Sequence, residues 1–198
     1  MPHIRPFRPG DESALVEICL KTADAGGDAT GVFEDDDVWA AVFVLPYVAR
    51  HPEFAFVVET DDGRVVGYAV GAPDTHAFED WFAAEWWPRF AGRWPRPESE
   101  RTRQDGTLIY ASSRRAGAEP YGDTYPAHLH IDLLPELQGQ GWGRRLIDTL
   151  ADALRAAGVT GLHLVADAGN TGALAFYERI GFTPLPSHEG VQAFGRML

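Results

Sequence analysis

The chain has 198 residues, of which 45% are hydrophobic, and it contains a single cysteine. This length and composition predict one folded domain over residues 1–198 and exclude a disordered chain or a disulfide-rich scaffold. A formal net charge of −12 argues against a nucleic-acid surface, which needs clustered positive charge. The acidity favours a cationic partner such as an amine, or it serves only solubility.

No apolar run of about 18 residues occurs in the sequence, and the N-terminal stretch lacks the apolar segment of a secretion signal. We therefore expect a cytoplasmic protein with no membrane partner. The cysteine, Cys19, stands between Ile18 and Leu20 and has no histidine near it in the sequence. This setting predicts a small buried residue and not a reactive thiol.

In chain order, residues 3–8 predict a short strand that turns into a helix. Three aspartates at 35–37 precede an apolar helix at 38–49, where they complement the positive end of the helix dipole. A metal site there would need ligands from elsewhere, and no histidine or cysteine spacing indicates them. Residues 54–60 and 65–71 are rich in β-forming side chains and flank an Asp-Asp-Gly-Arg turn, which predicts a hairpin.

Residues 76–90 are predicted to be a helix that gathers Phe78, Trp81 and Phe82 on one face. A large aromatic face either belongs to the core or lines a substrate cavity, and the sequence leaves both readings open. A loop at 91–106 follows, and then a short helical or irregular segment.

The segment 128–134 is predicted to be a strand, and the candidate site is built around it. Apolar and polar side chains alternate along it, so that one face joins the core and the other presents His128, His130 and Asp132. Pro135 cannot donate a backbone N–H to a neighbouring strand, which ends the strand pairing at that point.

At the end of this strand, before Pro135, the backbone groups of Leu133 and Leu134 are expected to be free for another partner. A helix is predicted at 144–157, because apolar residues recur at helical spacing there. Free N–H groups and the positive end of a helix dipole converge where such a helix begins, which predicts a cradle for a pyrophosphate. The turn that feeds the helix consists of Gln138, Gly139, Gln140, Gly141, Trp142 and Gly143.

The last part of the chain predicts two strands with a helix between them. Residues 162–166 read as a buried strand, and 171–180 as a helix with Phe176 and Ile180 turned inward. A final strand at 191–197 is expected to pair with the segment 182–185.

The strand and its turn resemble the acyl-CoA loop of the GNAT acetyltransferase superfamily, Gln-x-x-Gly-x-Gly after a strand. Other nucleotide-binding fingerprints fit less well: Arg144 stands where G-x-G-x-x-G needs its third glycine, and no Gly-Lys-Ser/Thr is present. A second motif makes the resemblance specific, because it follows at the superfamily's spacing; it comprises Asn170, Ala173, Phe176, Tyr177, Glu178, Gly181 and Phe182.

This resemblance implies an α/β fold: a central mixed, twisted β-sheet flanked by α-helices, with a V-shaped splay at its central strands. It implies acetyl-CoA as co-substrate, without a metal, and the segment at 76–106, longer than the minimal core needs, would cover the acceptor side of the cleft. The cofactor-binding positions that it implies are the backbone at Leu133 and Leu134, the turn Gln138 to Gly143, and Asn170, Ala173, Phe176 and Tyr177.

The resemblance also implies catalytic roles. Tyr177 matches the tyrosine that protonates the departing thiolate, although a tyrosine at this place can also simply fill space in the core. Asp132 lies on the polar strand face beside the thioester position and can take the proton of an ammonium, directly or through water, if burial raises its pKa. Alternatively, Asp132 is tied to a neighbouring backbone group. Asn170 can bind the cofactor and cap a helix at the same time.

The first half of the chain resembles, more loosely, the acetyltransferase-like domain at the C-terminal end of animal O-GlcNAcases. The similar residues are Val66-Gly67-Tyr68-Ala69-x-Gly71, Asp74, Phe78 and Trp86-x-Pro88. That domain lacks a good cofactor loop, whereas this chain keeps Gln138 to Gly143, so we expect cofactor binding here.

These features predict an acetyl-CoA-dependent N-acetyltransferase that uses direct attack by an amine in a ternary complex. The alternative is a non-catalytic acyl-CoA-binding or protein-interaction module with the same fold. The acceptor stays open among protein lysines, amino sugars, polyamines and antibiotics, since the segments that select it follow no transferable rule. An exposed strand edge would allow a homodimer.

Overall fold

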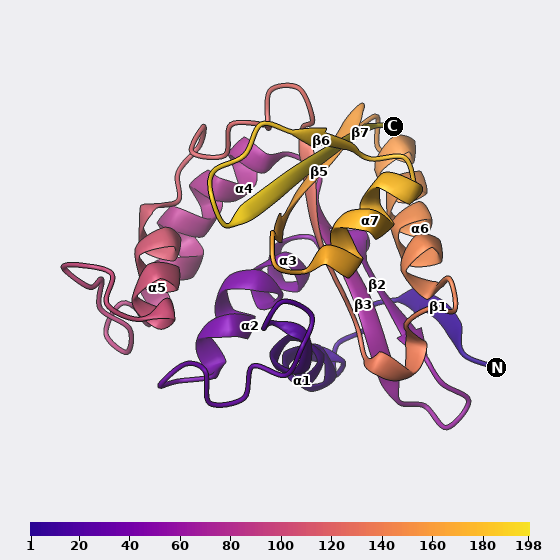
Figure 1. Ribbon diagram of the computed structural model, residues 1–198, viewed down its shortest axis with the longest axis horizontal. Helices are drawn as coiled ribbons and strands as arrows, with labels where there is room; N and C mark the ends of the chain where they lie inside the picture. The colour runs from indigo at the N-terminus through magenta and orange to yellow at the C-terminus, as the bar shows by residue number, and fades with distance from the viewer.

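The computed structural model describes residues 1–198 and contains one seven-stranded sheet with helices on both faces (Figure 1). The strand order is β1-β2-β3-β4-β5-β7-β6, and only the β4–β5 pair is parallel, so the sheet is mixed as predicted. The strands are β1 (His3–Pro6), β2 (Ala55–Glu59), β3 (Val65–Ala72), β4 (Ala127–Leu133), β5 (Gly161–Asp167), β6 (Thr183–Leu185) and β7 (Val191–Met197).

The helical elements lie between these strands along the chain. The α-helices are α1 (Glu12–Thr22), α2 (Asp37–Phe43), α3 (Leu45–Arg50), α4 (Thr75–Trp81), α5 (Arg103–Ser113), α6 (Trp142–Ala156) and α7 (Thr171–Arg179). The shorter helical turns are η1 (Pro52–Phe54), η2 (Phe82–Trp86), η3 (Trp87–Phe90) and η4 (Pro135–Leu137). The predicted hairpin is confirmed as β2–β3, and the predicted pairing of the last strand as β6–β7.

Two helices predicted as continuous are broken. The helix expected at 38–49 is α2 followed by α3, with Val44 out of helical conformation at φ −136°. Pro46 explains the break, because its ring collides with the preceding turn and it has no N–H to donate. The segment 76–90 is α4, one π-helical turn and a 3₁₀ turn that contains Pro88.

The helix after the predicted loop at 91–106 begins earlier than expected. It is α5, which starts at Arg103, inside the stretch predicted to be a loop. Thr102 and Asp105 form a capping box: the Thr102 hydroxyl accepts from the Asp105 N–H, and the Asp105 carboxylate accepts from the Thr102 N–H. This Thr-x-x-Asp spacing is the sequence signal that would have located the helix start.

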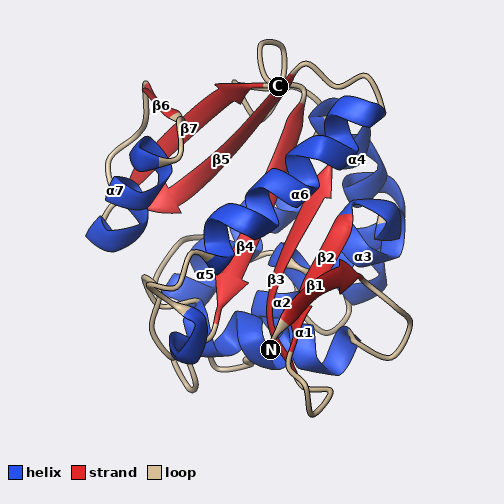
Figure 2. Cartoon of the chain, turned by 90° about the vertical axis from the view of Figure 1, so that its right-hand side faces the viewer, coloured by secondary structure: helices blue, strands red, loops and turns tan.

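Each face of the sheet has its own hydrophobic core. Helix α1 packs on β3 and β4 on one face, and α6 lies across β2, β3 and β4 on the other (Figure 2). The aromatic side chains Phe78, Trp81 and Phe82 are buried in the core on the α1 side. Their aromatic face is therefore core, and not the substrate wall that the sequence left open.

The sheet opens between its two central strands. Strand β4 pairs with β3 from His128 to Leu133, but with β5 only at Ala127 and His128. Strand β5 pairs with β7 along its whole length, so β4 and β5 separate beyond His128 (Figure 2). The predicted V-shaped splay is thus present, and it leaves the β5-facing edge of β4 without a strand partner.

A buried arginine holds the outer edge of the sheet to α1. The Arg5 guanidinium on β1 contacts both Asp11 oxygens, at 2.7 and 2.9 Å, and donates to Glu59 of β2 at 2.5 Å. The Arg5 side chain is 8% exposed and that of Asp11 12%. The interaction with Arg5 holds the pKa of Asp11 below its usual range.

We expect Asp11→Asn to lower the free energy of unfolding by about 1–3 kcal/mol at pH 7, because it leaves a buried cation with one partner fewer. The pKa of Asp11 is depressed in the folded state, so its contribution is present above the unfolded value of about 4 and is lost as pH falls through the folded value. Urea unfolding at pH 7 and near pH 3 measures both effects. The control is Asp28→Asn, which breaks an exposed pair with Lys21 and should change little; equal effects of the two variants would contradict this account.

Candidate active site

Two cavities meet on the polar face of β4. The first, the loop cavity, measures about 690 Å³ and extends from Asp132 to the turn before α6. The second, the aromatic cavity, measures about 640 Å³ and runs from Asp132 towards α2 and α5. Asp132, Asn170 and Tyr177 line both cavities. The two spaces therefore connect where β4 and β5 separate.

The loop cavity ends at the N-terminus of α6. Gly141 precedes the helix with a φ of +83°, a left-handed conformation that favours glycine. The N–H groups of Trp142, Gly143 and Arg144 have no partner within the chain, since the first helical bond at this end is donated by Arg145. Three free donors at the positive end of a fifteen-residue helix form a site for an anionic group.

Close packing accounts for the glycine at Gly143. A Cβ atom added there would lie 3.0 Å from Cζ of Phe176, so the start of α6 can approach α7 only without a side chain. Phe176 lines the loop cavity from α7. The two predicted motifs, far apart in the sequence, are thus the two walls of one cavity.

Of the two glutamines in the turn, Gln138 lines the loop cavity and Gln140 does not. The Gln138 side-chain amide donates to the carbonyl of Leu133 at 3.0 Å, and Gln138 lines the loop cavity. Gln140 donates instead to the carbonyl of Glu136 at 2.6 Å and lines neither cavity.

The expectation of free backbone groups is right only for the N–H of Leu133: the Leu133 carbonyl accepts from Gln138, and both groups of Leu134 are paired. The Leu134 N–H donates to Val66 of β3 at 3.1 Å, and its carbonyl accepts from Leu137 at 2.9 Å. Because neighbouring residues of a strand direct their backbone groups to opposite edges, the Leu133 N–H faces the gap towards β5. The ladder ends at Pro135 as predicted, but its last bond is the one from the Leu134 N–H, and the turn that begins at Pro135 takes the Leu134 carbonyl.

Helix α7 supplies two residues to the junction of the cavities. The Asn170 Oδ1 atom accepts from the Ala173 N–H at 3.1 Å, so Asn170 is the N-cap of the helix. Tyr177 is the inward residue of α7, 8% exposed, whereas Phe176 and Ile180, which were predicted to point inward, are only half-buried. The Tyr177 hydroxyl has no hydrogen-bond partner in the chain, and burial raises the pKa of this phenol.

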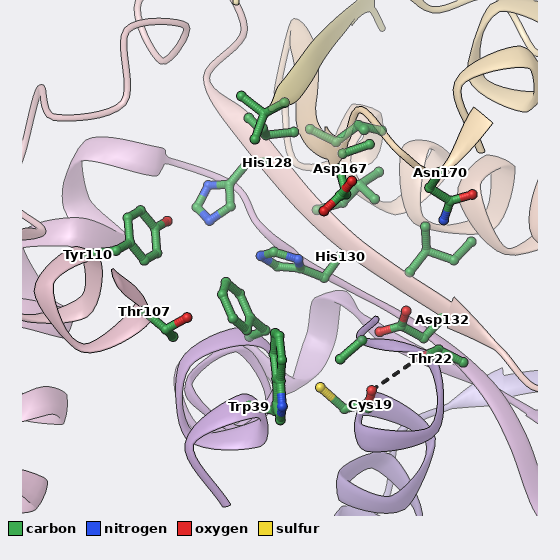
Figure 3. Close-up of a pocket in the computed structure, with 18 of the residues that line it drawn as sticks. Cys19, Thr22, Trp39, Thr107, Tyr110, His128, His130, Asp132, Asp167 and Asn170 are labelled. Atoms are coloured by element: carbon green, nitrogen blue, oxygen red, sulfur yellow. Dashed lines mark hydrogen bonds between the residues drawn. The ribbon is translucent and has the colours of Figure 1, made fainter. Parts of the chain in front are cut away.

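Asp132 is the ionisable group at the junction. Burial raises the pKa of its carboxyl, while the Tyr68 hydroxyl of β3 donates a hydrogen bond to it and opposes that rise. Figure 3 shows Asp132 and His130 directed from β4 into the aromatic cavity, with Trp39 and Tyr110 across from them. Cys19 lies near Asp132; its thiol is buried with a raised pKa, as expected of an unreactive cysteine.

Behind His130, four side chains form a directed hydrogen-bond chain. The Thr75 hydroxyl lies 2.8 Å from the carbonyl of Pro126 and must donate to it, so it accepts from Nδ1 of His128 at 2.9 Å. Nε2 of His128 is then an acceptor for the Tyr47 hydroxyl at 2.8 Å, and Tyr47 accepts from Nε2 of His130 at 3.1 Å. The chain fixes His128 as the neutral tautomer protonated at Nδ1 and places a proton on Nε2 of His130.

The histidine pKa values agree with this arrangement. Burial lowers the pKa of His128 well below its usual value, and burial with the nearby Arg114 charge lowers that of His130 to about 3. An imidazole with so low a pKa is a weak base, so Asp132 is the better proton acceptor of the two. Sequence reasoning missed Tyr47 and Arg114, which belong to no motif. It named Tyr68 only for its resemblance to O-GlcNAcases, without a role at the site.

No helix is both long enough and apolar enough to span a bilayer. No group of three or more His, Cys, Asp or Glu side chains is arranged to hold a metal ion.

The sequence profile of the acetyltransferase (GNAT) family matches residues 23–182. Among curated relatives, Protein O-GlcNAcase of Rattus norvegicus is 23% identical over 94% of this chain, and mycothiol acetyltransferase of Beutenbergia cavernae is 29% identical over 90%. The chain matches only 20% of the length of the first and 52% of the second.

Solved structures share the fold. The crystal structure of SsHAT superposes with a TM-score of 0.94 at 41% identity, covering 99% of this chain and 98% of that one. An N-acetyltransferase (PaiA) from Thermoplasma acidophilum, solved in complex with coenzyme A, has a TM-score of 0.62 at 12% identity, with 100% and 99% covered. This last similarity concerns the fold alone.

Proposed function

Since this chain belongs to the GNAT acetyltransferase family, we propose that it is an acetyl-CoA-dependent N-acetyltransferase acting on a primary amine by direct attack in a ternary complex. The observation that carries the proposal is the junction of two cavities at Asp132 and Tyr177. A donor can enter through one cavity and an acceptor through the other, so that the reacting groups meet without a covalent enzyme intermediate.

In this proposal the loop cavity binds acetyl-CoA. The free N–H groups of Trp142, Gly143 and Arg144 hold the pyrophosphate, with Gln138, Gly139 and Gly141 forming the turn around it. The Leu133 N–H receives the pantetheine arm along the open edge of β4, opposite Asn170, Ala173 and Phe176. Coenzyme A and acetyl-CoA complexes of structures with the same fold support this assignment.

The chemical step needs a base and an acid. The amine lone pair attacks the thioester carbonyl carbon, the amine gives up a proton to Asp132, and the carbon–sulfur bond breaks as the tetrahedral intermediate collapses. The departing thiolate takes a proton from Tyr177, whose raised pKa keeps it protonated up to strongly alkaline pH. Its unpartnered hydroxyl supports this role.

The alternative is a non-catalytic acyl-CoA-binding module. Release of free thiol from acetyl-CoA, measured over a panel of amines, separates the two proposals: binding without thiol release supports the module. The unpartnered Tyr177 hydroxyl and the raised pKa of Asp132 favour the enzyme, because neither arrangement is needed to bind a cofactor.

We expect Gly141→Trp to abolish acetyl-CoA binding in calorimetric titration, because its side chain would project from the turn into the loop cavity. Gly158→Trp is the matched control: Gly158 follows the other end of α6 with a φ of +82°, and like Gly141 it has no atom within 4 Å of an added Cβ. Both variants bear the same backbone strain, so only Gly141→Trp should lose binding. Equal affinities would place the cofactor elsewhere.

We expect Tyr177→Phe to lower kcat by about 10²–10⁴-fold while the affinity for acetyl-CoA stays within about threefold, because only the proton donor is removed. Steady-state kinetics and calorimetry on the same preparation measure both quantities. A variant that keeps full kcat would show that the thiolate is protonated by another group or by water.

We expect Asp132→Asn to lower kcat/KM and to remove the acidic limb of its pH profile, measured with one amine throughout. Burial raises the pKa of Asp132, so in the wild type this limb lies above the ordinary carboxyl value of about 4, and activity falls as pH drops through it. Tyr68→Phe removes the donor that favours the carboxylate and should move the limb to higher pH. His130→Gln should leave the limb in place; its disappearance in that variant would transfer the role of base to His130.

A further inference from the structure

The far end of the aromatic cavity contains a buried cation without an anionic partner. Arg114, the residue that follows the last turn of α5, is 6% exposed. Its Nε and Nη1 atoms are buried without a hydrogen-bond partner, and the guanidinium makes no ion pair within 4 Å. The faces of Phe82, Phe78 and Tyr110 surround it, with ring centres at 4.5, 5.2 and 5.4 Å. Aromatic rings offset only part of the cost of removing a charge from water. An anion bound beside the guanidinium would offset the remainder.

The neighbouring acids do not supply this anion. Glu79 and Glu119 line the same cavity, but neither approaches the guanidinium within 4 Å. Burial raises the pKa of both carboxyls, that of Glu119 to about 6. The Arg114 charge also helps to depress the pKa of His128 and His130, so it acts on the whole cavity.

The guanidinium and the proposed base lie at opposite ends of a continuous row of side chains. Arg114 stands over Phe78, which stacks on Tyr47 with ring centres 4.5 Å apart, and the Tyr47 hydroxyl contacts His130. His130 and Asp132 are two residues apart on β4, roughly 7 Å along the strand. A ligand that reaches from Asp132 to Arg114 must therefore place several bonds between its two polar ends.

We propose that Arg114 binds a carboxylate of the acyl acceptor, so that the acceptor is an amino acid whose amine and carboxylate stand at opposite ends of the molecule. This inference rests on the proposed function. The apolar middle of such a molecule would lie along Trp39, Phe43 and Tyr110. A single negative charge matches the single positive charge of the guanidinium, whereas a phosphate dianion would leave its second charge unpaired in the cavity.

The test compares three amines of equal length with different far ends: ε-aminocaproate, ε-aminocaproamide and hexamethylenediamine. We expect the wild type to prefer the carboxylate over the amide by about 10- to 100-fold in kcat/KM, as for a hydrogen bond between charged groups. Arg114→Gln should reduce this preference to within about threefold, and Arg114→Lys, which keeps the charge, should retain part of it. If Arg114 served stability alone, Arg114→Gln would lower kcat/KM for all three amines by the same factor and leave the ratio of carboxylate to amide unchanged.

Arg103→Gln is the matched control. Arg103 lines the same cavity, but its side chain is half-exposed and paired with Asp24 at 2.7 Å. Its replacement should leave the preference for the carboxylate unchanged. A loss equal to that in Arg114→Gln would show that a diffuse positive potential selects the acceptor, which would overturn the assignment to Arg114.

Two further outcomes separate this inference from the proposed function. A wild-type enzyme that acetylates hexamethylenediamine or the amide at least as well as ε-aminocaproate overturns the role of Arg114 and leaves the acetyltransferase proposal intact. If no amine is acetylated, calorimetry of ε-aminocaproate into wild-type and Arg114→Gln protein decides the question without turnover. Binding that needs both the carboxylate and Arg114 supports the anion site, and its absence overturns it.

Discussion

The separation of β4 from β5 is the constraint on which the rest of the site depends. Two paired positions join these strands, after which β5 follows β7 and the edge of β4 is left open. An open strand edge in the middle of a sheet exposes backbone donors that must find another partner. Both cavities lie along this opening, and the N-terminus of α6 meets it at one end. A single topological feature thus accounts for both cavities.

The opening also determines the electrostatics of the junction. A carboxylate on the polar face of a fully paired central strand would be covered, whereas Asp132 borders two cavities and remains accessible to ligands. Its pKa reflects two opposed effects, burial and the hydrogen bond from Tyr68. The histidines next to it are held neutral by burial and by Arg114. In our proposal, Asp132 activates the amine and the Arg114 guanidinium selects it.

Local patterns predicted those parts of the structure that depend on short stretches of chain. The hairpin of β2 and β3, the glycine turn before α6 and the polar face of β4 follow from alternation and turn chemistry alone. The predictions failed where a neighbour decided the outcome. Pro46 divides a helix that periodicity made continuous, Leu134 pairs with β3 through a contact far away in sequence, and Tyr177 rather than Phe176 turns inward on α7.

The sequence by itself determined the strand, the loop and the second motif, because each is a run of residues whose spacing has a local physical meaning. Only the tertiary structure decided that Asn170 and Tyr177 face Asp132, that Tyr68 donates to it, and that Tyr47, His128 and Thr75 form one hydrogen-bond chain. The same holds for Arg114, which no motif marks. Its lack of an anionic partner is a property of everything packed around it, and such a property cannot be read from one segment of a chain.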